Sequence, residues 1–258
     1  MHIQTIRLLS QNAAALNVEL NEIKKSEPVS LAICFGTFTA IKALSQANGL
    51  GAVAENWLAG SSCLGCSDQF GINSELPNSA TLFLLDDKEG HYGVGSADLA
   101  DNCRKSASDA LEQAMEKAGK PNELPALIWC LQAPGNEEQV LAGLQDLVGD
   151  KVPIFGGSSA DNDVAGDWLQ YDGNVLYGNG VVVLALYGST PLSTYFSSGY
   201  SASTSVGTVT AVDGRTLQSI DHKPAASVYN DWLAQEGKAP LQEGSILMEA
   251  LFHHLGAS

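Results

Sequence analysis

The sequence predicts an α/β (α+β) fold with two pseudo-repeats of about 95 residues and a small C-terminal hairpin-helix element. In each repeat we expect a mixed sheet, with the two sheets packed together and helices outside. Three observations predict this fold. Short apolar strand-like runs alternate with segments of helical periodicity. Sequence features of the first half recur in the second, and the residue pattern changes after residue 200.

The recurring landmarks keep their order and spacing. Gly60-Ser61-Ser62 returns 97 positions later as Gly157-Ser158-Ser159, and Cys34 returns 96 positions later as Cys130, each within an apolar run. A third apolar run, 81–85, matches 181–186. We therefore expect a duplicated unit over 5–98 and 101–200, with the same strand order in both copies.

Three segments repeat apolar residues at helical spacing. The first carries Leu9, Ala13, Leu16, Leu20 and Ile23 on one face, and predicts that the N-terminus leads straight into a helix. A second ends before Gly119, a fitting C-terminal cap. The third covers 137–148 and ends at Gly149, with its inward side chains predicted to be Val140, Leu144, Leu147 and Val148.

The C-terminal part has a different pattern. Two strand-like runs, 208–212 and 216–220, flank Asp213-Gly214 and predict a hairpin. Helices are expected over about 225–234 and over 246–255. We expect one domain over 1–200 and a thin segment over 201–258.

Charge and composition exclude several classes of function. The net charge is −16 with only 13 basic residues, so nucleic acid and anionic membrane surfaces are not expected partners. The longest apolar run, 181–186, is too short to span a bilayer, and the N-terminus lacks the layout of an export signal. Five cysteines, an odd number, favour reduced thiols and a cytoplasmic location.

The two Gly-Ser-Ser loops are the best candidates for a site. Glycine at a strand end allows close backbone approach, and two hydroxyls with free amides form a polar cup. Duplication would place both loops near a pseudo-twofold axis, facing one cleft; the alternative is that each only makes a turn. The predicted ligand-binding residues are Gly60, Ser61, Ser62, Cys63, Gly157, Ser158, Ser159, Asp161, Asn162 and Asp163.

Asp161 is predicted to contact a ligand amine or to cap a turn. With Asp163, Asp167 and Asp172 it partly matches a calcium loop, but Ala165 and the strand-like flanks do not fit, so no metal is expected. Cys63 and Cys66 form a CxxC without the second pair that zinc needs.

Other catalytic chemistry has little support. No histidine lies in a nucleophile motif, no phosphate loop is present, and no catalytic residue is predicted. His222 or His91 could ligate a haem iron, which keeps a haem protein as the alternative to a site without a cofactor. A hydrolase using serine or cysteine ranks third.

The same residues resemble the FIST family (F-box and intracellular signal transduction proteins). The matching stretches are 59–63, 155–163, 169–175, 180–187, 209–215, 220–225 and 229–233. Two features depart from the family pattern. The family's C-terminal domain would be expected to continue past Ser258, and Asp221-His222 stands where Asp-Gly is expected.

The resemblance implies an N-type sensory domain followed by part of a C-type domain. It implies a non-enzymatic module of intracellular signal transduction that binds small polar molecules such as amino acids. The alternative that it implies is a haem-based nitric-oxide sensor, which would regulate a histidine kinase or a cyclic-dinucleotide enzyme.

Overall fold

The structure is a computed structural model that describes all residues except 11, 25–26, 64–65, 69–70, 73–78, 164, 198–199, 242–254 and 257–258. The chain forms two compact units, 1–194 and 195–258. The predicted boundary at residue 200 lies shortly after the one observed. In the described parts of the chain, no helix is long and apolar enough to cross a membrane.

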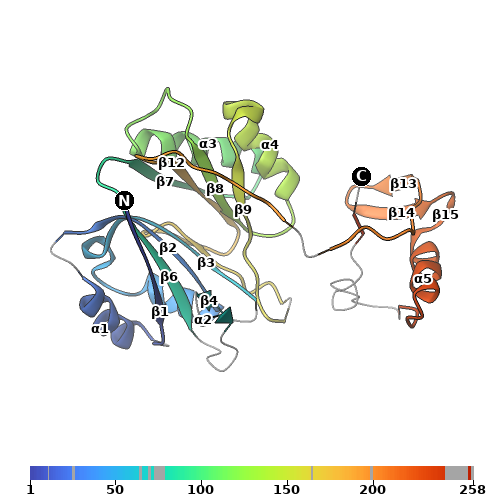
Figure 1. The fold of residues 1–258 in the computed structure, drawn as a ribbon, viewed down its shortest axis with the longest axis horizontal. Helices are drawn as coiled ribbons and strands as arrows, with labels where there is room; N and C mark the ends of the chain where they lie inside the picture. The colour runs from blue at the N-terminus through green and yellow to red at the C-terminus, as the bar shows by residue number, and fades with distance from the viewer. Residues whose placement is uncertain are drawn as a thin grey trace. The chain divides into compact units, whose positions relative to one another are not determined.

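The first unit contains two main sheets (Figure 1). The first has the order β1-β6-β2-β3-β10-β11, and its only parallel pair is β2 with β3. Its strands are β1 (His2–Leu8), β2 (Val29–Gly36), β3 (Ala54–Ser61), β6 (Ala80–Asp86), β10 (Gln170–Tyr171) and β11 (Leu176–Tyr177). The short strands β4 (Ser67–Asp68) and β5 (Gly71–Ile72) form a separate two-stranded sheet.

The second sheet repeats this arrangement, with the order β7-β12-β8-β9 and β8 parallel to β9. Its strands are β7 (His91–Asp98), β8 (Leu127–Gln132), β9 (Ile154–Ser158) and β12 (Gly180–Tyr187). Cys34 in β2 lies opposite Ala59 in β3, and Cys130 in β8 lies opposite Gly156 in β9. The equal strand order supports the predicted duplication, and the superposition of the two copies stays a prediction.

The division between the sheets differs from the expected one. Strand β7 joins the second sheet, so the boundary between the repeats falls at residues 87–90 and not near residue 100. Strands β10 and β11, from the second half, join the first sheet. In each repeat the first strand therefore pairs with a later strand of the same repeat, β1 with β6 and β7 with β12.

Helices cover the outer face of each sheet, which gives four layers (Figure 1). Alternate residues of β2 explain the layering: Leu31 and Ile33 pack against the other sheet, whereas Ala32 and Cys34 pack in the core that includes α1 and α2. The predicted fold class, with packed sheets inside and helices outside, is confirmed. The helices are α1 (Ala13–Ile23), α2 (Phe38–Ser45), α3 (Cys103–Lys117) and α4 (Glu137–Val148), with short 3-10 turns at Leu50–Ala52 and Gly149–Lys151.

Two local predictions were wrong. The N-terminus forms strand β1 before α1 begins, and Leu9 lies outside the helix with 53% of its surface exposed. Asn12 caps α1 by accepting a hydrogen bond from the Ala15 amide, which fixes the start of the helix. In α4 the inward face holds Val140, Leu144 and Val148, but Leu147 is 37% exposed.

Helix α3 lies very close to strand β7. A Cβ atom at Gly93 or Gly95 would run into the backbone of α3, around Ala110, Ala114 and Ala118. Small residues on both sides allow this approach. It brings Lys117, the last residue of α3, over β7, where its ammonium donates to the Val94 carbonyl at 2.8 Å.

The second unit contains the predicted hairpin and helix. Strands β13 (Val209–Asp213), β14 (Thr216–Ile220) and β15 (Lys223–Pro224) precede helix α5 (Ala225–Gln235). The turn residues are Gly214 and Arg215, one position later than expected, because Asp213 still pairs with Thr216 and Gly214 takes the positive φ. The helix predicted over 246–255 lies almost wholly outside the described residues.

Candidate ligand-binding site

The structure brings the two Gly-Ser-Ser loops together. In each, the glycine and the first serine end the second parallel strand of the sheet, β3 or β9, and the last serine follows it. The Ala160 amide donates to the Ser61 carbonyl at 3.0 Å. Leu169 joins both loops: its amide donates to Ser61 Oγ at 2.9 Å, and its carbonyl accepts from Ser159 Oγ at 3.1 Å.

The buried residues of the two loops, Gly60, Ser61 and Ser159, have structural roles. Ser61 and Ser159 are 2% and 1% exposed, and the hydrogen bonds just described use both hydroxyls. Gly60 faces the other sheet, where a Cβ atom would run into Leu131. These three residues therefore hold the loops in place.

A small pocket remains beside them, at the carboxyl ends of β2 and β3. We call it the Ser62 pocket; its volume is about 160 Å³. The end of β3, the start of α2 and the loop after β9 meet there. Its lining residues are Thr37, Phe38, Thr39, Ser62, Asp161, Asn162, Asp163, Ala165 and Asp167.

The start of α2 gives the Ser62 pocket a positive wall. Thr37 is the N-cap, and its hydroxyl accepts from the Ala40 amide at 3.4 Å. The amides of Phe38 and Thr39 come first in the helix, so neither has an acceptor within it. The first turn carries no acidic residue, which leaves the helix dipole available to an anionic group.

Aspartates give the pocket negative charge. Asp161, Asp163 and Asp167 line it, and no lysine or arginine is among its described lining residues. Asp161 Oδ2 accepts from the amides of Gly166 at 2.7 Å and Asp167 at 2.9 Å. Asp161 is thus a turn cap, as one of the two sequence interpretations holds, and it also lines the pocket.

The partial calcium loop is not assembled. Asp172 accepts from the amides of Asn174 and Val175 and from Ser96 Oγ, and it does not line the pocket with the other acids. Within the described ranges, no group of three or more His, Cys, Asp or Glu side chains could hold a metal ion.

Other predicted site residues lie outside the pocket. Gly157 and Ser158 are exposed, and Ser158 Oγ donates to Glu137 at 2.8 Å. Cys63 is exposed, whereas Cys66 is buried with its sulfur 3.2 Å from Ser79 Oγ. Three residues that line the pocket were not predicted from the sequence: Thr37, Phe38 and Thr39. Their one signal in the sequence is a threonine soon after an apolar strand, which is a common N-cap residue.

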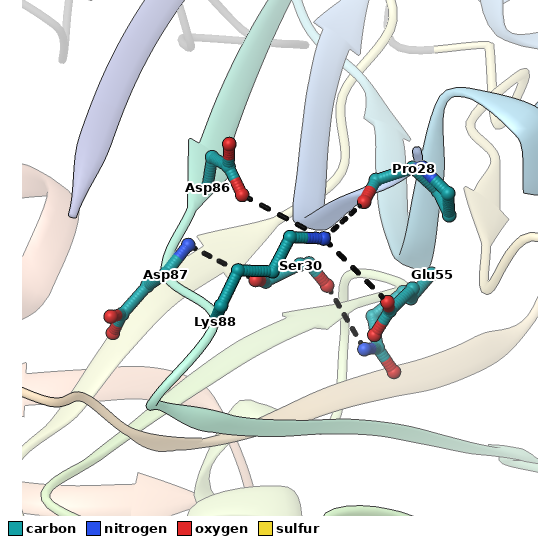
Figure 2. A network of polar contacts seen from close by, with 7 residues as sticks. Pro28, Ser30, Glu55, Asp86, Asp87 and Lys88 are labelled. Carbon is teal, nitrogen blue, oxygen red and sulfur yellow. Dashed lines mark hydrogen bonds and ion pairs between the residues drawn. The ribbon is translucent and has the colours of Figure 1, made fainter. Parts of the chain in front are cut away.

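A second pocket of about 230 Å³ lies at the amino ends of β2 and β3. We call it the Lys117 pocket. Figure 2 shows the polar network on one side, where Lys88 Nζ donates to the Pro28 carbonyl at 2.6 Å and faces Glu55 and Asp86. Its lining residues are Ser30, Glu55, Asn56, Asp87, Lys88, Gly90, His91, Tyr92, Lys117 and Ala118.

Neither histidine of the haem alternative lies in a suitable environment. His91 is exposed at the start of β7 and lines the Lys117 pocket, whose walls are polar and charged. That pocket is smaller than the roughly 300–1,000 Å³ of sites for drug-sized ligands. His222 is exposed in the turn after β14 with φ +62°, in the other compact unit. These surroundings do not fit a haem.

Comparisons with known proteins identify the family. The family model described as FIST N domain matches residues 30–223, so the chain belongs to this family. No curated protein matches it. A solved structure of cyanuric acid hydrolase from A. caulinodans is similar over 72% of this chain and 67% of its own, with 10% identity and a TM-score of 0.38. Membership in the family suggests a sensory signalling module for a small ligand.

Proposed function

We propose that this chain is a non-catalytic sensory module that binds a small zwitterion, such as an amino acid, in the Ser62 pocket. The observation that carries the proposal is that two kinds of group line the same pocket. Three aspartates line it together with the start of α2, so negative side chains and a positive helix end share one small space. An ammonium group suits the aspartates, and a carboxylate suits the free amides of the helix.

The second half of the fold supports the carboxylate position. At the start of α4, Glu137 accepts hydrogen bonds from the Gly135 amide and from Ser158 Oγ. The protein's own carboxylate therefore occupies that helix start. Helix α2 lacks an acidic residue in its first turn, so the equivalent place is left for a ligand.

The pocket's size limits the ligand. Its volume of about 160 Å³ is below the roughly 300–1,000 Å³ of sites for drug-sized ligands. We expect small or short polar amino acids to bind better than aromatic ones.

Catalysis has no support from this geometry. The two buried serine hydroxyls are engaged with Leu169, and no histidine or lysine lines the pocket to activate Ser62. A signalling partner, a histidine kinase or a cyclic-dinucleotide enzyme, stays a prediction.

The test is a thermal-shift screen of amino acids with the full chain, followed by calorimetric titration of the best ligand. Asp163→Asn and Ser62→Ala should each weaken binding, the first by about ten- to a hundredfold because a charge-assisted hydrogen bond is lost. Binding of the best ligand by Asp163→Asn as tightly as by the parent would overturn the proposal.

Two variants are needed to test Asp161, because this residue both caps a turn and lines the Ser62 pocket. Asp161→Asn keeps an oxygen that can accept from Gly166 and Asp167 but removes the charge, so the loop should persist while affinity falls. Asp161→Ala removes both and should also lower the melting temperature. Equal affinity of parent and Asp161→Asn would limit Asp161 to its role as a cap.

A further inference from the structure

We propose that the Lys117 pocket is a second binding site, specific for a small oxyanion such as a carboxylate or a phosphate. It lies at the opposite strand ends of β2 and β3 from the Ser62 pocket. The two pockets also differ in charge. The charged residues that line the Ser62 pocket are all aspartates, whereas this one is lined by two lysines and a histidine together with Glu55 and Asp87.

The acidic groups of the Lys117 pocket already have partners. Lys88 Nζ lies 3.9 Å from Glu55 and 3.8 Å from Asp86 (Figure 2). Asp87 is buried and accepts from the Ser189 amide at 3.0 Å, from Ser189 Oγ, and from the Tyr92 hydroxyl at 2.6 Å. Of the two carboxylates that line the pocket, Glu55 therefore has Lys88 beside it and Asp87 has three hydrogen-bond donors.

The hydrogen-bond donors of the Lys117 pocket, unlike its carboxylates, keep unused N–H groups. Lys117 donates only to the Val94 carbonyl, which leaves two of its three N–H groups, and it forms no ion pair with any described residue. Asn56 donates one N–H of its amide to the Ser30 carbonyl and has another. His91 adds an exposed imidazole.

The lining therefore keeps unused hydrogen-bond donors on Lys117 and Asn56, and Lys117 has no carboxylate partner among the described residues. A small anion with several oxygens satisfies Lys117, His91 and Asn56 together. Cations and neutral apolar molecules do not.

The experiment is an NMR titration of the 15N-labelled full chain at constant ionic strength, once with inorganic phosphate and once with succinate. We expect saturable shifts of the Gly90, His91 and Tyr92 amides with at least one probe, and the responding probe distinguishes the two sources of the oxyanion. No saturable shift of these amides with either probe overturns the proposal.

Variants localise the binding. Lys117→Gln should weaken it about ten- to a hundredfold, since one charge-assisted hydrogen bond is lost, and Lys117→Arg should restore most of it. Lys105→Gln is the matched control, because Lys105 lies on the same helix and pairs with Asp109 away from the pocket. A folded Lys117→Gln protein with parental affinity contradicts the proposal.

Two further variants keep the test decisive. If Lys117→Gln fails to fold, His91→Gln, a change at an exposed residue, must weaken binding. Ser62→Ala must leave it unchanged, which separates this site from the Ser62 pocket. Parental affinity of His91→Gln in that case, or a loss with Ser62→Ala, overturns the proposal.

Discussion

The two Gly-Ser-Ser loops have the same sequence and follow equivalent strands, yet their residues have different environments. Gly60 and Ser61 are buried and Ser62 lines a pocket, whereas Gly157 and Ser158 are exposed and Ser159 is buried. The neighbouring strand explains the difference. Strand β10 covers the outer edge of β3, pairing at Gly60 and Ala59, while β9 is the last strand of its sheet in the described part of the chain.

Sequence identity between the loops therefore does not imply equal roles. In the interior strand β3 the Gly-Ser pair is packed, and the serine that follows the strand lines a pocket. In the edge strand β9 the Gly-Ser pair is exposed to solvent, and the serine that follows the strand donates to the Leu169 carbonyl. If this contrast is correct, equivalent substitutions in the two halves should have unequal effects.

Cysteine labelling should show the largest difference, between Cys63 after β3 and the buried strand cysteines Cys34 and Cys130, which should behave alike. Burial raises the pKa of the thiols of Cys34 and Cys130 to about 12, with a further contribution to Cys34 from Cys66. At pH 8 each has over about a thousandfold less thiolate than an ordinary thiol of pKa about 8.5. Cys63 is exposed, so mass spectrometry after a short pulse of iodoacetamide should find it labelled first. Rapid labelling of Cys34 or Cys130 in the native protein would contradict the predicted burial.

Gly60→Ala and Gly157→Ala test the packing contrast. A Cβ atom at Gly60 would run into Leu131, so overpacking should cost about 1–3 kcal/mol in the free energy of unfolding. A Cβ atom at Gly157 meets nothing within 4 Å, and that change should stay within about half a kcal/mol. Urea denaturation of both variants measures the difference, and equal midpoints would refute it.

Asp87→Asn tests the link between the two halves, since Asp87 follows β6 and its partner Ser189 follows β12. We expect a loss of about 2 kcal/mol at pH 7, the value of hydrogen bonds to a charged group. Burial opposes ionisation, but the bonds from Ser189 and Tyr92 outweigh it and lower the pKa of Asp87.

The pH dependence of this link has a defined sign. A carboxyl with a lowered pKa in the folded state stabilises the fold above its unfolded pKa of about 3.9, and this contribution is lost as pH falls through the folded value. The stability gap between parent and Asp87→Asn should therefore be widest near neutral pH and narrow at pH 3. A gap that stays constant over this range would show that the charge of Asp87 does not contribute.

Ser61→Ala and Ser158→Ala should show the smallest contrast. Removing the Ser61 hydroxyl leaves the Leu169 amide without its acceptor in a buried place, at a cost of about 1 kcal/mol or somewhat more. Ser158 is exposed and bonds only Glu137, so its loss should be close to neutral. Chemical denaturation checks both, and a larger effect at Ser158 would reverse the assignment.

The sequence by itself determined the layers, the equivalent strands and the family of this protein. Apolar runs such as 181–186 and the helical period of 137–148 are local patterns that burial on one or both faces requires, so they could be read without a structure. The repeated Gly-Ser-Ser segments likewise marked the ends of β3 and β9.

Only the tertiary structure decided which of those residues are accessible. The strand β10, two residues long, has no periodicity to detect, yet it pairs with β3 at Gly60, and Leu169 just before it donates to the buried Ser61 hydroxyl. The Ser62 pocket joins residues 37–39 to 161–167, and the Lys117 pocket joins residue 30 to residue 117. Such contacts depend on how sheets and helices pack over long sequence separations, which no local pattern of residues encodes.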